Sequence, residues 1–353
     1  MTTRQRTLPS SAAAAIIALT AAGSAIGLPT SAHAAVPKVA TNWTRLMHRS
    51  LTHDTTLATM RTTLATHQAA VRASNAEVAA AAKAERGTRA VLKTATIADA
   101  NAQARYTSAR KALNTAKQGL NTVSKSKSKS RTRAIARAKR AVTAATKTVT
   151  VRKSQAQNAA AALSAAGKAS RAARARIAKA DAAVAAESAA VAKTQNAITA
   201  LPTAAALATQ AAAVSRDVVE QVRPAFKNTD TTKVYGVTVH RNIAFAFKRM
   251  IDDAKADGVE ISGGGFRTKE RQAELRKING CPDVWTAPSS SCRVPTAIPG
   301  RSLHELGLAV DITSGGKTIT SKSVAFKWMQ AHAKEYGLIN FPAEAWHWSI
   351  SGS

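Results

Sequence analysis

Large apolar residues recur at seven-residue intervals along most of the first two thirds of the chain. One series runs from Leu57 to Leu120 and a second runs from Ile135 to Ile198, and the position three residues further on is mostly alanine. A sustained seven-residue repeat on helix-forming residues is typical of a coiled coil, and small residues in the seam let two helices approach closely. The pattern predicts two long helices within residues 55–200.

A polar segment in which Ser and Lys alternate, residues 124–130, separates the two series. A turn in this segment places Leu120 opposite Ile135 and Leu57 opposite Ile198, so that apolar residues face one another along both arms. We therefore expect an antiparallel coiled-coil hairpin with its tip near residues 124–130. The alternative is a disordered basic tail that binds nucleic acid through its charge, and the unbroken repeat opposes it.

Shorter segments border the hairpin on both sides. Residues 35–54 are interpreted as a short exposed lead-in whose one aromatic residue is Trp43. Pro202 ends the second arm, because proline cannot continue a helix. Residues 201–233 are expected to hold a short further helix and a polar linker, and a separate domain is expected over residues 234–353.

The first 34 residues have the pattern of a secretory signal peptide. Arg4 and Arg6 precede an apolar run over residues 12–28, and Ala32-His33-Ala34 fits a small-x-small cleavage site. We expect cleavage after Ala34. An uncleaved membrane anchor is the alternative, although the run is short for a membrane span.

The net charge of +31 is concentrated in the residues before 217. Residues 217–353 contain 18 Lys and Arg against 14 Asp and Glu, so that residues 1–216 contain 33 against 6. Such a field attracts polyanions of any kind. The alternative to a polyanion-binding surface is a basic surface that contacts only water.

The chain has two cysteines, Cys281 and Cys292, which enclose a short loop rich in Pro and Ser. In an exported protein such a pair indicates a disulfide, which at this loop size contributes about 3 kcal/mol in the chain-entropy model. A pair of zinc thiolates is the alternative.

Residues suited to metal chemistry gather in two short stretches near the C-terminal end. His304 and Asp311 lie seven residues apart, and Glu344 precedes His347 by three. Two His and one Asp are a suitable set of three ligands for a catalytic zinc, which keeps its fourth position for water. Glu344 is then expected to accept the proton of that water.

Glu305 directly follows His304 but is not assigned a catalytic role. Because position 308 is Leu308, the His-Glu-x-x-His zinc helix is absent. We expect Glu305 to lie behind the site or to be exposed.

The order Ser302-x-His304-x-x-Gly307-x-Ala309-x-Asp311, followed by Glu344-x-Trp346-His347, resembles the motifs of the VanY-like zinc D-alanyl-D-alanine carboxypeptidases. Relatives of that family include dipeptidases and phage endolysins that cut the peptides of the bacterial cell wall. The resemblance extends upstream to Ser262-Gly263-Gly264-Gly265-Phe266-Arg267-Thr268 and Gln272, and it covers residues 234–353. Ala345 stands where the family usually has proline, a difference that touches no side-chain chemistry.

The resemblance implies an α+β domain, an antiparallel sheet with helices on its outer side, preceded by the all-α hairpin. It implies that His304, Asp311 and His347 hold the zinc and that Arg267 stabilises the tetrahedral intermediate. It also implies that Gln272 and Ser302 contact substrate.

The sequence therefore predicts a secreted or wall-located zinc metallopeptidase that hydrolyses peptidoglycan stem peptides, in the first place as a D-alanyl-D-alanine carboxypeptidase. An endopeptidase of the same fold and a wall-binding protein without turnover are the alternatives. The basic hairpin is expected to contact anionic wall polymers such as teichoic acids. Neither a nucleic-acid partner nor a membrane span after signal cleavage is expected.

Overall fold

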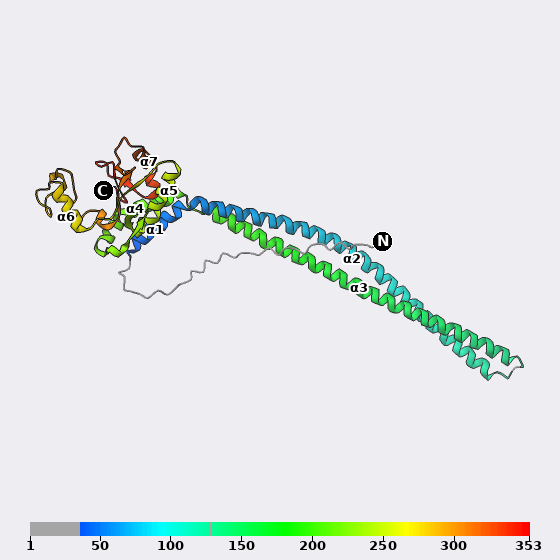
Figure 1. Cartoon of the computed structure of the whole chain (residues 1–353). Helices are drawn as coiled ribbons and strands as arrows, with labels where there is room; N and C mark the ends of the chain where they lie inside the picture. The colour runs from blue at the N-terminus through cyan, green and yellow to red at the C-terminus, as the bar shows by residue number, and fades with distance from the viewer. Residues whose placement is uncertain (1–35, 128) are drawn as a thin grey trace, which may run out of the picture.

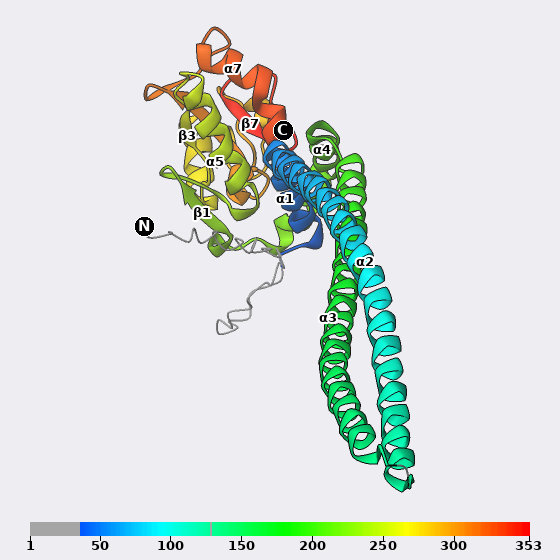
Figure 2. The ribbon, with the colours of Figure 1, turned by 90° about the vertical axis from the view of Figure 1, so that its right-hand side faces the viewer.

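A long two-helix hairpin projects from a smaller body of helices and short strands (Figures 1 and 2). This computed structural model describes residues 36–127 and 129–353, so the predicted signal peptide, residues 1–34, lies outside the described residues. Within the described ranges, no single helix meets the length and hydropathy expected of a membrane span. The pair α3 (Arg131–Thr199) and α4 (Ala204–Ala225), bent by 49°, meets them jointly by length and composition alone.

The hairpin consists of α2 (His53–Lys125) and α3, which run antiparallel and lie side by side. The helices contain 73 and 69 residues, so each is about 100–110 Å long. Small side chains fill the seam between them, as the alanine positions of the repeat predict. The buried alanines of the two arms are Ala81, Ala109, Ala156, Ala166, Ala173 and Ala180.

Residues 35–54 do not form the exposed lead-in that the sequence suggested. Most of this segment is the helix α1 (Lys38–Leu51), whose Ala40, Trp43 and Met47 lie on one face and are at most 1% exposed. Their spacing of three and four residues makes one apolar stripe along the helix. Because that stripe packs into the core of the C-terminal body, α1 belongs to that body.

The further helix expected within residues 201–233 is α4, and it takes up most of the segment that was expected to include a polar linker. Thr203 caps α4, its hydroxyl accepting a hydrogen bond from the N–H of Ala206, and the buried face of α4 includes Leu207, Val218 and Val222. The indole N–H of Trp43 donates to the hydroxyl of Ser215 at 3.1 Å and joins α4 to α1 inside the core. The polar connection shrinks to the few residues after Ala225.

Both ends of the hairpin meet at one place on this body. The hydroxyl of Ser50, at the end of α1, donates a hydrogen bond of 2.8 Å to the carbonyl oxygen of Ala204, at the start of α4. The hairpin is therefore an insertion between two helices that pack against each other.

The body is completed by two antiparallel sheets and three further helices. His240 caps α5 by accepting from the N–H of Asn242, and Phe247 and Met250 of that helix are fully buried. The smaller sheet pairs β1 with β2; in the larger, the order is β3-β4-β7-β6, with β5 also paired to β4. The bounds are β1 (Thr231–Val234), β2 (Val237–His240), α5 (Arg241–Ala256), β3 (Ser262–Gly264), α6 (Lys269–Ile278), β4 (Ala309–Ser314), β5 (Lys317–Thr318), α7 (Val324–His332), β6 (Ile339–Asn340) and β7 (His347–Ser349). The predicted fold class, a long helical part before an α+β domain with antiparallel strands, is confirmed.

The loop after α6 is held from two sides. Cys281 and Cys292 form the predicted disulfide. The guanidinium of Arg276, fully buried, donates to the carbonyl oxygens of Asp283, Ala287 and Thr296. This loop therefore has a fixed path beside the candidate site.

Candidate active site

Sheet register brings two of the three predicted metal ligands together. Asp311 on β4 lies directly opposite His347 on β7, as one pair in an antiparallel ladder. Residues opposite each other in such a ladder have Cβ atoms about 4.5–5.5 Å apart. His304 lies in the 3₁₀ turn His304–Leu306, which enters β4 through Gly307 in a left-handed conformation (φ 66°).

The glycines before Arg267 allow backbones to pack tightly behind the site. A Cβ at Gly265 would overlap the carbonyl oxygen of Thr238, and one at Gly263 would overlap that of Asp311. A Cβ at Gly264 would meet nothing within 4 Å. Two of the three glycines are thus required by close approach of the chain.

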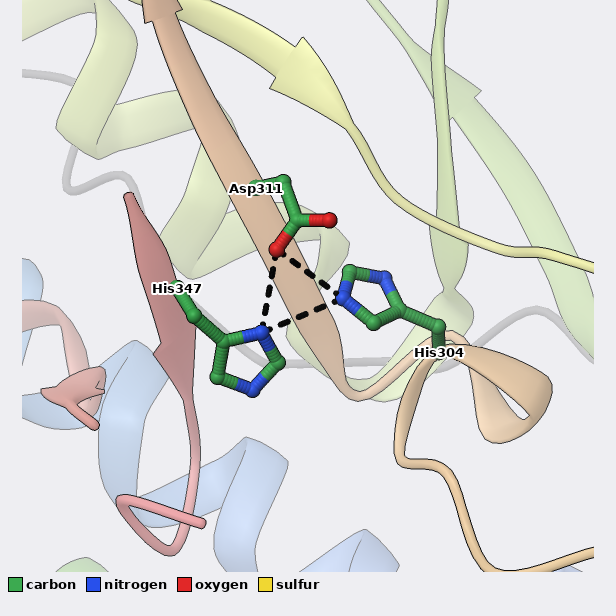
Figure 3. A group of neighbouring side chains, drawn as sticks. All are labelled: His304, Asp311 and His347. Carbon is green, nitrogen blue, oxygen red and sulfur yellow. Dashed lines mark hydrogen bonds and ion pairs between the residues drawn. The ribbon is translucent and has the colours of Figure 1, made fainter. Parts of the chain in front are cut away.

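Three donor atoms converge at the site (Figure 3). The Nε2 of His304 lies 3.1 Å from Oδ1 of Asp311 and 3.2 Å from Nδ1 of His347, and that Nδ1 lies 3.0 Å from the same carboxylate oxygen. Ligands bound to zinc at 2.0–2.1 Å in a tetrahedron are separated by about 3.3 Å. The triangle therefore has the dimensions of a three-ligand zinc site.

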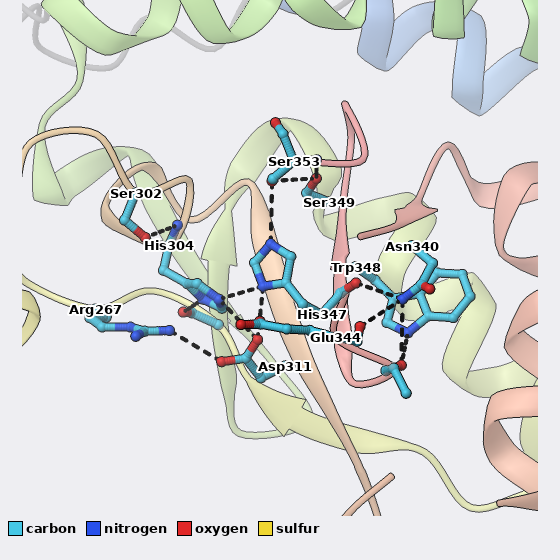
Figure 4. Close-up of polar contacts among 12 residues, drawn as sticks. Arg267, Ser302, His304, Asp311, Asn340, Glu344, His347, Trp348, Ser349 and Ser353 are labelled. Atoms are coloured by element: carbon cyan, nitrogen blue, oxygen red, sulfur yellow. Dashed lines mark hydrogen bonds and ion pairs between the residues drawn. The ribbon is translucent and has the colours of Figure 1, made fainter. Parts of the chain in front are cut away.

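Outer hydrogen bonds orient the lone pairs of both imidazoles toward the same point. Nδ1 of His304 lies 2.7 Å from the carbonyl oxygen of Gly265, and Nε2 of His347 lies 3.3 Å from the main-chain oxygen of Ser353 (Figure 4). Because a carbonyl only accepts, each of these nitrogens is the one that carries hydrogen. The opposite nitrogens then face the Asp311 carboxylate with lone pairs, an arrangement that a cation stabilises.

The ionisation of these groups also suits a metal. Burial lowers the pKa of His304, so its imidazole is neutral. Burial alone would raise the pKa of Asp311, but the two imidazoles beside the carboxylate outweigh burial and hold that pKa far below its usual range. Neutral imidazoles and an ionised carboxylate are the forms that coordinate zinc.

Arg267 and Glu344 complete the centre (Figure 4). The guanidinium of Arg267 donates to Oδ2 of Asp311 at 3.1 Å, which leaves Oδ1 facing the two imidazoles. Glu344 lies in the loop between β6 and β7 and lines a cavity that His304, Asp311 and His347 also line. Burial raises the pKa of its carboxyl, and the positive charge of Arg267 partly offsets that effect.

Asn340 fixes the turn that carries Glu344 and His347, a role that was not predicted from the sequence. Its amide donates to the carbonyl oxygens of Glu344 at 3.0 Å and of His347 at 2.9 Å. The N–H of His347 in turn donates to the carbonyl oxygen of Glu344 at 3.1 Å. Asn340 precedes the motif by four residues, and nothing in its neighbourhood separates it from an ordinary loop asparagine.

The remaining predicted residues have structural contacts beside the cavity. Gln272 is 1% exposed, and its amide donates to the carbonyl oxygen of Ala297 at 2.8 Å. The Ser302 hydroxyl accepts from the N–H of His304 at 3.3 Å. Both line the cavity, and both also hold the loop that leads into His304. Glu305 is buried behind the site, which is one of the two placements expected from the sequence. Its carboxylate accepts a hydrogen bond from the N–H of Gly300.

A cavity of about 450 Å³ extends from the three donor atoms toward the disulfide loop. Its wall includes Arg267, Ser302 and Glu344 at the metal end and Leu275 and Ser289 toward that loop. The centre therefore opens onto a space that can take several linked residues of a peptide.

Comparison with known proteins identifies the C-terminal part. Residues 236–353 match the family model described as VanY: D-alanyl-D-alanine carboxypeptidase. A D-alanyl-D-alanine carboxypeptidase of Enterococcus faecalis (strain ATCC 700802 / V583) is 32% identical over 124 residues, which are 29% of this chain and 44% of the relative. The putative carboxypeptidase YodJ of Bacillus subtilis (strain 168) is 31% identical over 107 residues, 29% of this chain and 38% of the relative.

Among solved structures, a mutant of the vancomycin-resistance D,D-pentapeptidase VanY from a VanB-type cassette, in complex with Zn(II), is 25% identical to this chain. That match covers 34% of this chain and 78% of the other, with a TM-score of 0.28. The chain spans less than half the length of the two curated relatives. Residues 236–353 form a domain of the VanY family, and the helices before them lie outside its model.

Proposed function

We propose that this protein is a zinc metallopeptidase that removes the terminal D-alanine from peptidoglycan stem peptides. The observation that carries the proposal is the triangle of His304, Asp311 and His347, in which two fixed imidazole lone pairs and one carboxylate oxygen face a single point beside Glu344. The family of residues 236–353 supports the same substrate class.

His304, Asp311 and His347 would hold the ion. A bound zinc supplies a Lewis acid that polarises the scissile carbonyl and lowers the pKa of water to about 7. The residues around it divide the remaining work. Asp311 is kept ionised, and Arg267 holds its second oxygen and thereby orients the first.

Glu344 is the general base in this proposal. A carboxyl whose pKa is raised by burial holds a proton more readily than an exposed one, and so it can take the proton of the attacking water and deliver it to the leaving amine. Arg267 is also placed to bind a negative oxygen, because its fixed fork of N–H donors matches an oxyanion or a terminal carboxylate.

Zinc stoichiometry and hydrolysis test the proposal together. The full chain, dialysed against a chelator and reloaded, should bind one zinc per molecule and release D-alanine from a synthetic pentapeptide. His304→Ala should no longer bind zinc, whereas Glu344→Gln should bind zinc but release no D-alanine. Release of D-alanine by the zinc-free His304→Ala variant would contradict the ligand set. Bound zinc and bound peptide without any product from the native chain would instead favour a wall-binding protein.

We further propose that the chain is exported. The signal-like pattern of residues 1–34 supports export, and so does the disulfide between Cys281 and Cys292, since disulfides persist in oxidising compartments. Expression with and without residues 1–34, followed by fractionation, tests this; equal retention of both forms inside the cell would contradict it.

We also propose that the outer half of the hairpin contacts anionic wall polymers. Residues 100–155, which form the outer part of both arms, contain 15 Lys and Arg and no Asp or Glu, so that this part of the hairpin is a rod of one charge sign. Such a rod attracts a polymer of phosphates, and the attraction weakens as salt screens it.

Binding to purified walls tests the hairpin proposal. Replacing five exposed cations at the tip by Gln should weaken binding at low salt more than replacing five exposed cations near the base. Removing the anionic polymers from the walls should abolish that difference, and equal binding by both variants would contradict the proposal. The tip residues are Arg131, Arg133, Arg137, Lys139 and Arg140, and the base residues are Arg61, Arg72, Lys83, Arg86 and Lys93.

A further inference from the structure

Helix α4 reaches the active-site cavity from outside the family domain. Val219 and Arg223 of α4 line the cavity, although the match to the family begins at residue 236. The half-buried guanidinium of Arg223 donates a hydrogen bond of 2.7 Å to the carbonyl oxygen of Gly300. Gly300 directly precedes the segment that carries Ser302 and His304, so Arg223 holds that segment and keeps further N–H donors for another partner.

A second guanidinium lies beside the first. Arg301 lines the same cavity and is exposed, and its guanidinium has no hydrogen-bond or ion-pair partner within residues 36–127 and 129–353. The two groups interact: burial lowers the pKa of Arg223, the charge of Glu305 acts in the opposite direction, and the charge of Arg301 lowers it further.

One carboxylate is already present beside this pair. Both oxygens of Glu305 accept from the backbone N–H of Gly300, at 2.9 and 2.8 Å, and its charge offsets that of Arg223. The guanidinium of Arg301 has no ion-pair partner among the described residues, and an unpaired positive charge in the wall of a cavity favours the arrival of an anion.

We propose that Arg223 and Arg301 form a subsite for a second carboxylate of the substrate peptide, borne by a residue on the amino side of the cleaved bond. The proposal rests on the proposed peptidase function and adds a specificity to it. Stem peptides offer two groups of this chemistry: the α-carboxylate of a γ-linked glutamyl residue, and the second carboxylate of a diamino diacid at the third position. Arginine suits either one, because its planar fork matches a carboxylate with two parallel hydrogen bonds.

Three synthetic pentapeptides with the same D-alanyl-D-alanine end distinguish the two sources. One carries both inner carboxylates, one is amidated at the glutamyl residue, and one is amidated at the third residue. With the full zinc-loaded chain, we expect amidation at one of the two positions to lower kcat/KM about 10-fold, chiefly through KM. A tenfold change corresponds to about 1.4 kcal/mol, within the range of one charge-assisted pair.

Substitution of Arg301 tests whether the preference for the acidic peptide arises at this subsite. Arg301→Gln should reduce the ratio of kcat/KM between the acidic and the amidated peptide to about one. Arg223→Gln should reduce the ratio too and lower turnover of every peptide, because it also releases Gly300. Arg45→Gln, which removes an exposed arginine of α1 outside this cavity, should keep the wild-type ratio.

Equal turnover of all three peptides by the native chain would overturn the subsite, as would a preference that survives Arg301→Gln. If the zinc-loaded chain cleaves none of the peptides, the proposed peptidase activity is contradicted but the subsite is not. Calorimetric measurement of the binding of the same three peptides then tests the subsite. Equal affinities would then overturn the subsite, whereas a weaker affinity for one amidated peptide, lost in Arg301→Gln, would support it.

Discussion

Excision of the hairpin should leave the C-terminal body folded, whereas removal of α1 should unfold it. Because Ser50 and Ala204 are hydrogen-bonded, residues 53–202 can be replaced by four Gly and Ser residues, which span about 11 Å as a flexible chain. The resulting variant keeps α1, α4 and every residue of the C-terminal body. A fragment of residues 217–353, by contrast, loses α1 and half of α4.

The cost of the shorter fragment follows from what it no longer buries. Trp43, Leu46, Met47 and Leu207 are all at most 7% exposed, and each such side chain contributes about 1.5–3 kcal/mol when fully buried. Together they represent about 6–12 kcal/mol, which is comparable to the entire stability of a typical domain. We therefore expect the 217–353 fragment to be largely unfolded at 25 °C.

Thermal and urea unfolding followed by near-UV circular dichroism provide the assay. The hairpin-excised variant should unfold cooperatively, and the 217–353 fragment should show no cooperative transition. A 217–353 fragment that melts cooperatively within a few degrees of the hairpin-excised variant would refute the assignment of α1 and α4 to the core.

Three further predictions address the base, the glycines and pH. Glu344→Gln should keep one bound zinc and lower kcat at least about 100-fold, as measured by D-alanine release; near-native turnover would contradict its role as base. Gly265→Ala should destabilise by at least about 2 kcal/mol in urea unfolding, because the added Cβ meets the carbonyl of Thr238, whereas Gly264→Ala should stay within about 0.5 kcal/mol. Burial lowers the pKa of His240 from about 6.5 to about 4, so the folded state disfavours its protonation. The corresponding stability is fully present above pH 6.5 and is lost as pH falls toward 4, by about 3 kcal/mol in urea titrations; a His240→Asn variant with the same loss would contradict this.

Features with a local period could be predicted from the sequence. The hairpin repeats every seven residues, and its polar turn interrupts both series at once, so the arms and the turn follow from the pattern alone. His304, Asp311, Glu344 and His347 occur in two short stretches whose spacing matches a known arrangement. For these residues the structure adds the geometry, which the spacing cannot provide.

Features that depend on distant partners could not be predicted. Helix α1 buries only three large apolar side chains, Trp43, Leu46 and Met47. The hydrogen-bond partner of Trp43, Ser215, lies 172 residues away, so no local pattern indicates that Trp43 is buried. Nor does any local pattern reveal that Asp311 and His347 occupy opposite positions in a ladder. The position of Arg223 in the cavity wall could not be predicted either, because Arg223 lies on α4, outside the residues that match the family model.

Mass spectrometry of digested peptidoglycan shows which bond the protein cuts. The full chain, loaded with zinc, would be incubated with muropeptides that carry pentapeptides and with crosslinked dimers, and the masses of the products would be measured. We predict that the pentapeptides lose a single alanine and that Glu344→Gln abolishes this loss. A cut within the stem or the crosslink, with pentapeptide ends left intact, would contradict the carboxypeptidase assignment and identify an endopeptidase instead.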